Sequence, residues 1–254
     1  MSDFSGYKSF AKIAAWFTFI YVILFQFIIQ PNLILPSPAS MFDSIDSLLN
    51  EYHFVSALGL TSFLVILVPI FGFVFCYATK YWCAKLFLNF EMHSTLFFTF
   101  RFFSYFFLLL FMVYWFQSSP VAELVFLLIV AGLEQKIYLS ELVRKIDPNY
   151  FHTLKSLGVS DKKIIGGVFS KLMKPYIFEK LHLLFLSAWG WALVYEYISG
   201  TFGIGNLMRK AILYNDLSTL ALLVVIMIVV IFISGFVFKL IHYKVITWIP
   251  DELK

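Results

Sequence analysis

The chain has 254 residues, of which 61% are hydrophobic and only 13% charged, and its mean hydropathy is +0.87. Soluble domains carry roughly a quarter of charged residues, so this composition excludes a soluble protein. The net charge is +4, and the only cysteines, Cys76 and Cys83, are too few for a disulfide framework. We therefore expect an all-α integral membrane protein.

Six segments are long and apolar enough to cross a bilayer as helices, which takes about 20 residues. They are Ile13–Ile29, Phe54–Thr79, Ser94–Phe116, Val121–Leu142, Tyr176–Ile198 and Leu217–Ile241. The first segment lacks a small-residue cleavage pattern, so we interpret it as a retained span rather than a signal sequence. Between the first and second spans, a loop with three prolines precedes a segment that we expect to be an amphipathic helix.

The basic residues fall mainly on one side of this predicted topology. With the N-terminus inside, the outer loops hold only Arg209 and Lys210. The long connection between the fourth and fifth spans holds eight basic residues when Lys136, near the cytosolic end of the fourth span, is counted with it. Cytoplasmic segments of membrane proteins carry an excess of Lys and Arg. This asymmetry predicts a multi-pass protein of a bacterial cytoplasmic (inner) membrane with both termini in the cytosol.

The connection from Asp147 to Tyr176 is the only long polar segment. Asp147 and Pro148 are typical of a helix start, and Gly158 is typical of a helix end because glycine tolerates a positive φ. Ser160 provides a second cap before a helix that returns to the membrane. The apolar residues of the first short helix recur with helical spacing at Tyr150, Leu154 and Leu157. Periodicity alone is equally compatible with a connector lying on the lipid surface.

The sequence offers no catalytic module. Not one glycine is followed by lysine, which excludes a phosphate-binding P-loop on this chain. The five histidines are scattered, and we expect no metal site. We therefore expect the chain not to be an enzyme, so that energy for any transport must come from another subunit or an ion gradient.

The polar connection resembles the signature loop of the permease subunits of binding-protein-dependent ABC importers. In that family the loop reads EAA, three residues, Gly, nine residues, Ile, any residue, Leu-Pro. Gly158 occupies the glycine position, while His152, Thr153 and Leu154 stand at the EAA positions, Val168 replaces the isoleucine, and Ser170 and Lys171 replace Leu-Pro. The match is a degenerate form of the loop.

Further matches occur in the family's order along nearly the whole chain. LILPSP (33–38) is similar to an external motif of the branch that imports taurine, aliphatic sulfonates, nitrate, bicarbonate and pyrimidine precursors of thiamine. The stretch 188–208 is similar to that branch's pattern of Ala-Trp, a glutamate, and Gly-hydrophobic-Gly, with Glu196, Gly203 and Gly205 at those positions. Trp248 resembles the tryptophan of the last cytosolic segment.

The resemblance implies one permease domain (1–254) of six spans, with a coupling helix in 147–175 that docks on an ABC ATPase. It implies alternating access for a small solute, such as an anionic sulfonate or nitrate or a pyrimidine-like compound. The implied partners are ATPase subunits carrying ATP and Mg²⁺, a second permease subunit forming a dimer (a homodimer is our expectation), a periplasmic or lipid-anchored substrate-binding protein, and membrane lipid. Neither nucleic acid nor a cofactor on this chain is expected. The expected ATPase contacts are Tyr150, Phe151, Leu154, Lys155, Leu157 and Gly158.

Ionisable residues inside spans usually face a bundle interior or water. We name Arg101, Trp189, Trp191, Tyr195 and Glu196 as candidates for the translocation pathway or gate. Arg101 could instead extend to the interface, and the aromatic residues could form an interfacial belt. For Glu196 we favour a buried carboxylate that holds the loop around Gly203 and Gly205 through backbone donors.

Two other functional classes stay open on the sequence. One is an ion-coupled secondary transporter, although such folds generally show repeated halves and broken helices. The other is a permease-like accessory subunit that does not transport, since the EAA positions are degenerate.

Overall fold

The computed structural model of the protein describes residues 12, 16, 19–25, 36–89, 105–116, 119–145, 153–160 and 163–245. Throughout these residues the regular secondary structure is helical. In chain order the elements are α2 (Pro38–Asn50), α3 (Phe54–Asn89), α5 (Tyr105–Phe116), α6 (Pro120–Lys145), the π-helix η2 (Ile164–Phe169), α9 (Ser170–Ser199), α10 (Ile204–Leu213) and α11 (Leu217–Val245). The expected all-α class is confirmed.

Among the residues that the structure describes, three segments are long and apolar enough to cross a membrane: Phe54–Thr79 in α3, Tyr176–Ser199 in α9, and Leu217–Ile241 in α11. Two of them have the predicted bounds and the third differs by one residue at its end. The predicted fourth span corresponds to α6, whose charged residues lower its hydropathy. The predicted first and third spans lie largely or partly outside the described residues, so the count of six stays a prediction.

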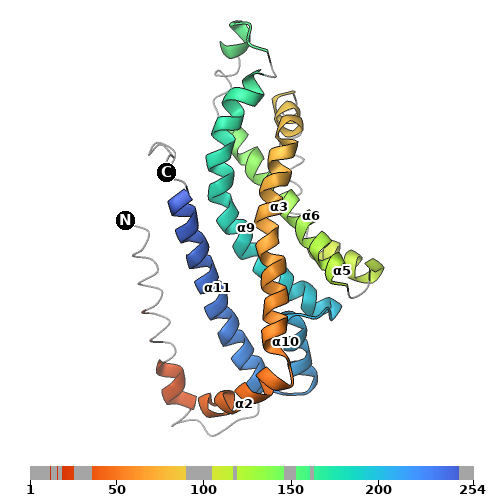
Figure 1. Ribbon diagram of the computed structural model, residues 1–254, viewed down its shortest axis with the longest axis vertical. Coiled ribbons are helices and arrows are strands. Elements are labelled where there is room, and N and C mark those ends of the chain that lie inside the picture. The colour runs from red at the N-terminus through yellow and green to blue at the C-terminus, as the bar shows by residue number, and fades with distance from the viewer. Residues whose placement is uncertain are drawn as a thin grey trace.

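The long helices α3, α9 and α11 run side by side, with α6 inclined against α3 and α9 (Figure 1). Helix α9 is the central element, since it packs against α3, α6, α10 and α11. Helices α2 and α10 lie at the same end of the bundle (Figure 1). Helices α3, α9 and α11 each contact at least one of these two short helices.

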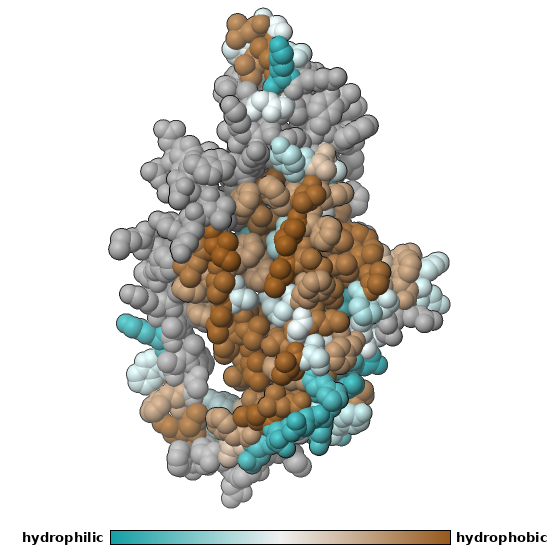
Figure 2. All heavy atoms as spheres, in the orientation of Figure 1, coloured by the Kyte–Doolittle hydropathy of each residue, from teal (hydrophilic) through white to brown (hydrophobic). Residues whose placement is uncertain are grey.

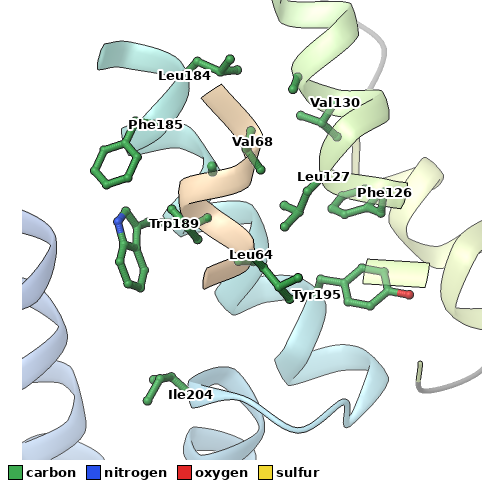
Figure 3. Packing of buried hydrophobic residues seen from close by; sticks show 14 of the residues in the cluster. Leu64, Val68, Phe126, Leu127, Val130, Leu184, Phe185, Trp189, Tyr195 and Ile204 are labelled. Carbon is green, nitrogen blue, oxygen red and sulfur yellow. The ribbon is translucent and has the colours of Figure 1, made fainter. Parts of the chain in front are cut away.

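The core between α3, α6 and α9 is built from interlocking apolar side chains (Figure 3). Leu64 and Val68 of α3 meet Leu127 of α6 and Leu184 of α9 in one buried cluster. Gly72 lets α9 approach closely, because a Cβ there would lie 2.9 Å from the Leu184 side chain. In a membrane such contacts cannot depend on exclusion from water alone, so close packing is what holds these helices together.

Two boundaries differ from the sequence-based prediction. Helix α3 continues to Asn89, through the stretch that was expected to begin a cytosolic connection at Lys80. The loop expected to contain Arg209 and Lys210 is instead largely helix α10. The amphipathic helix expected after the proline-rich loop is confirmed as α2, where Ser37 caps the helix by accepting a hydrogen bond from the Ser40 N–H at 3.3 Å.

Candidate functional site

A buried hydrogen-bonded group, which we call the Glu196 clasp, joins three helices at the α2–α10 end. It consists of Thr61, Glu196, Gly203, Ile204 and Gly205. The Glu196 carboxylate, fully buried near the end of α9, accepts the Thr61 hydroxyl of α3 at 2.5 Å and the Gly205 N–H of α10 at 2.7 Å. The Thr61 oxygen in turn accepts the Ile204 N–H at 3.2 Å. The unpaired amides at the start of α10 thus find a carboxylate and a hydroxyl.

Both glycines of the clasp are required by space. A Cβ at Gly203 would lie 2.1 Å from the Glu196 Oε1, and one at Gly205 would lie 2.2 Å from the Leu193 carbonyl oxygen. A side chain at Gly205 would push α10 away from α9, and one at Gly203 would displace either the Glu196 carboxylate or α10. The pattern Gly-hydrophobic-Gly therefore lets a helix start sit directly on a carboxylate, which is the role we expected for Glu196 from the sequence.

A second carboxyl group lies near the clasp and was missed by the sequence analysis. Glu123, in the first turn of α6, is fully buried, and its carboxyl group lies next to that of Glu196. An acidic residue in a first turn interacts favourably with the helix dipole. An acidic residue three positions after Pro120, at the start of a predicted span, is the sequence feature that could have identified Glu123.

The aromatic candidates of α9 point in different directions. Trp189 is 2% exposed and lies on the α11 side of α9, whereas Tyr195 points toward α6 (Figure 3). The Tyr195 ring stacks on Phe126 with centroids 5.2 Å apart. Trp191 is half-buried and meets the Tyr105 ring edge-on at 5.4 Å. Trp191 and Tyr195 therefore meet the α5–α6 side of the molecule, and Trp189 belongs to the core.

Helices α6 and α9 also share a polar face that the sequence analysis did not assign, which we call the α6–α9 polar face. Its members are all half-buried: Glu134, Tyr138, Glu141, Tyr176, Lys180 and Ser187. The Ser187 hydroxyl donates to Glu134 Oε2 at 3.0 Å, and the Tyr176 hydroxyl donates to Glu141 Oε2 at 3.3 Å. The Lys180 ammonium lies over the Tyr138 and Tyr176 rings, at 5.7 and 5.5 Å from their centroids.

The exposed faces of α3 and α11 have a different character. They present bulky apolar side chains such as Phe63, Ile70, Ile228 and Ile233, each more than half exposed. In the space-filling view, hydrophobic residues predominate on the face that the picture shows (Figure 2). Side chains of this kind suit lipid, whereas a carboxylate or an ammonium group facing lipid is costly. The α6–α9 polar face therefore suits water or another polar surface.

The polar connection forms a short helical turn with a glycine stop. The N–H of Val159 donates to the Leu154 carbonyl at 3.2 Å and the N–H of Gly158 to the Lys155 carbonyl at 2.9 Å, which is the Schellman pattern. Gly158 has a φ of +75°, so the predicted glycine stop is confirmed. Leu157 is 72% exposed beside this stop.

A second helix begins after this turn. Ser160 accepts the Ile164 N–H with its carbonyl at 3.1 Å, and η2 then leads into α9. The proposed contact residues Tyr150 and Phe151, and the pathway candidate Arg101, lie outside the described residues. Which residues contact an ATPase or line a pathway stays a prediction.

One known family matches the chain over most of these elements. The family described as binding-protein-dependent transport system inner membrane component matches residues 91–247, well over half of the chain. The matched region contains the α6–α9 polar face, the turn at Gly158, Glu196 and the start of α10. Neither a curated protein nor a solved structure matches the chain. The chain therefore belongs to the family of binding-protein-dependent transport system inner membrane components, the permease subunits of ABC importers.

Proposed function

We propose that this chain forms one half of the translocation pathway of an ABC importer and works by alternating access. The family supports a transport subunit in an inner membrane that works with an ATPase and a substrate-binding protein. The observation that carries the pathway is the α6–α9 polar face, since ionisable side chains that are only half-buried in a membrane need water or a polar partner. A second permease subunit facing this side would enclose the solute.

The energy for this cycle comes from hydrolysis of ATP, bound with Mg²⁺ on the partner ATPase. We propose that the coupling segment 147–175 docks on that ATPase through the turn that Gly158 ends. Leu157 supports this placement, because its side chain is 72% exposed beside the Schellman turn and therefore makes few packing contacts within its own subunit. A single exposed leucine is common on protein surfaces, so the docking rests on the resemblance of this segment to the family's coupling loop, and Leu157 is the residue that tests it.

Changing Leu157 to Asp tests the docking directly. A buried, unpaired charge at an interface costs several kcal/mol, so we expect co-purification of the ATPase and ATP-driven uptake to be lost while the permease still inserts in the membrane. Leu213→Asp is a matched control, because Leu213 is 65% exposed at the opposite end of the molecule, and the ATPase should remain bound.

Normal ATPase association in both Leu157→Asp and Leu154→Asp would contradict this docking site. Transport that depends on protons or sodium without any ATPase would instead favour a secondary transporter. An ATPase complex that never transports would favour an accessory role.

The sequence resemblance spans anionic solutes, namely sulfonates and nitrate, and uncharged pyrimidine-like solutes. Either group fits a permease of this kind, since the separate binding protein selects the solute first. After the solute is released from the binding protein, the charge of the residues that line the pathway favours one of these two groups of solutes over the other.

A further inference from the structure

Building on the proposed pathway, we infer that Glu134 and Ser187 form a solute subsite in the middle of the membrane that accepts N–H donors or cationic groups. Under this inference, the permease passes amino- or amidine-bearing solutes in preference to sulfonate or nitrate. The carboxylate of Glu134 is the group that makes this choice.

The depth of the two residues places them far from either surface. With a rise of about 1.5 Å per residue, Glu134 lies about 21 Å along α6 from Pro120, and Ser187 lies about 18 Å along α9 from Ser199. The hydrocarbon core is about 30 Å thick, so Ser187 lies near its middle, and the 3.0 Å hydrogen bond to Ser187 holds the Glu134 carboxylate at the same level. A carboxylate at that depth is costly and is typical of a functional position.

The hydrogen bonds of Glu134 leave it ready to accept a further donor. Ser187 donates to Glu134 Oε2 at 3.0 Å, and Tyr138 donates to the same oxygen at 3.5 Å. Both of these bonds therefore engage one carboxylate oxygen. Two hydroxyl donors hold the carboxylate in place, and the half-buried side chain still reaches accessible space.

Glu134 is the acidic group beside Ser187, and the lysine of the same face lies nearer the start of α9. Lys180 lies seven residues before Ser187 on α9, about 10 Å along the axis, and its ammonium group lies over the Tyr138 and Tyr176 rings. Beside Ser187 the α9 surface is open, since Gly190 is exposed and a Cβ there would meet nothing within 4 Å. A small solute could therefore approach Glu134 from this side.

Charged thiol reagents provide a test that does not require knowledge of the solute. In the complete transporter, in native membranes, Cys76 and Cys83 are replaced by Ala, and Ser187→Cys introduces a single thiol at the subsite. The probes are trimethylammonioethyl methanethiosulfonate, a cation, and sulfonatoethyl methanethiosulfonate, an anion. In each case the introduced thiolate attacks the probe, a disulfide forms, and methanesulfinate leaves.

We expect the thiol introduced by Ser187→Cys to react with the cation faster, and Glu134→Gln to lower the ratio of cation to anion rates by about tenfold, as expected for one charge within a few Å in a partly wet site. Glu134→Asp should retain most of the preference. Glu141→Gln is the matched control, because Glu141 lies two turns away beside Tyr176, and should change the ratio far less. Ile228→Cys, on the apolar face of α11, should react with neither probe.

The outcomes separate this inference from the function on which it rests. If the introduced thiol reacts with both probes and Glu134→Gln leaves their ratio unchanged, the charge selection is wrong while the pathway stands. If this thiol reacts with neither probe in a complex that retains its ATPase, both the position of the pathway and the subsite are wrong. Retained ATPase association shows that each variant is folded.

Discussion

Replacing Gly205 by Ala tests whether the Glu196 clasp is as tight as its geometry indicates. The added Cβ would lie 2.2 Å from the Leu193 carbonyl oxygen and 2.8 Å from both Glu196 Cβ and Tyr197 N. Two of these three atoms belong to the backbone of α9 and cannot turn aside. Helix α10 must therefore move, and the 2.7 Å hydrogen bond from the Gly205 N–H to Glu196 Oε2 lengthens or breaks.

The cost of this change has two parts. Overpacking of a tight contact costs about 1–3 kcal/mol, and loss of a hydrogen bond to a charged group costs about 1.5–3 kcal/mol. Their sum, about 2.5–6 kcal/mol, corresponds to a fall in melting temperature on the order of 10 °C for a chain of this size. Intrinsic propensity acts in the opposite direction, since Ala favours a helix over Gly by up to about 1 kcal/mol.

Thermal unfolding of the purified protein in detergent measures this effect. Gly59→Ala is the control, because Gly59 lies in α3 with nothing within 4 Å of the added Cβ, and its melting temperature should stay level or rise slightly. If Gly205→Ala melts within about 2 °C of the parent protein, the clasp tolerates displacement and the reasoning about its tightness is refuted.

Three further substitutions test neighbouring features. Thr61→Val keeps the side-chain shape but removes the hydroxyl. The buried Ile204 N–H then loses its acceptor and one Glu196 oxygen loses its donor, so the free energy of unfolding, measured by thermal unfolding, should fall by about 1–3 kcal/mol. In Glu196→Gln an amide NH₂ group replaces one carboxylate oxygen and faces a hydrogen-bond donor of the clasp. We expect a large fall in the yield of assembled transporter and a smaller change in the relative uptake of different solutes. Gly158→Ala forces a φ of +75° on a residue with a Cβ, at a cost of about 1–2 kcal/mol, and should weaken ATPase co-purification without lowering the melting temperature of the membrane bundle.

The sequence was sufficient for elements whose signal is local. The bounds of Phe54–Thr79 and Leu217–Ile241 could be predicted because uniform apolar segments end where polar residues begin. The glycine stop at Gly158 and the contact of Glu196 with Gly205 could also be predicted, since each depends on residues at most nine positions apart.

The features that were missed depend on distant residues or on short elements. Helix α10 was interpreted as a loop because Arg209 and Lys210 dominated its ten residues, although Ile204, Leu207 and Ala211 recur on one buried face. The bond between Ser187 and Glu134 joins positions 53 residues apart, and no periodicity predicts which partners α6 and α9 bring together.

From Lys163 onward, an unbroken helical path leads from the segment proposed to contact the ATPase to the Glu196 clasp. After the turn at Gly158, η2 runs directly into α9, whose 30 residues extend about 45 Å to Ser199. Glu196 holds the start of α10 near the far end of this rod, and Arg209 of α10 adds a hydrogen bond to the Ile198 carbonyl at 3.4 Å. Because α10 is tied to α9 at two points, a tilt of α9 at its proposed coupling end would displace α10 at the other end. The polar face with Glu134 and Ser187 lies between these ends, so the same tilt changes access to it.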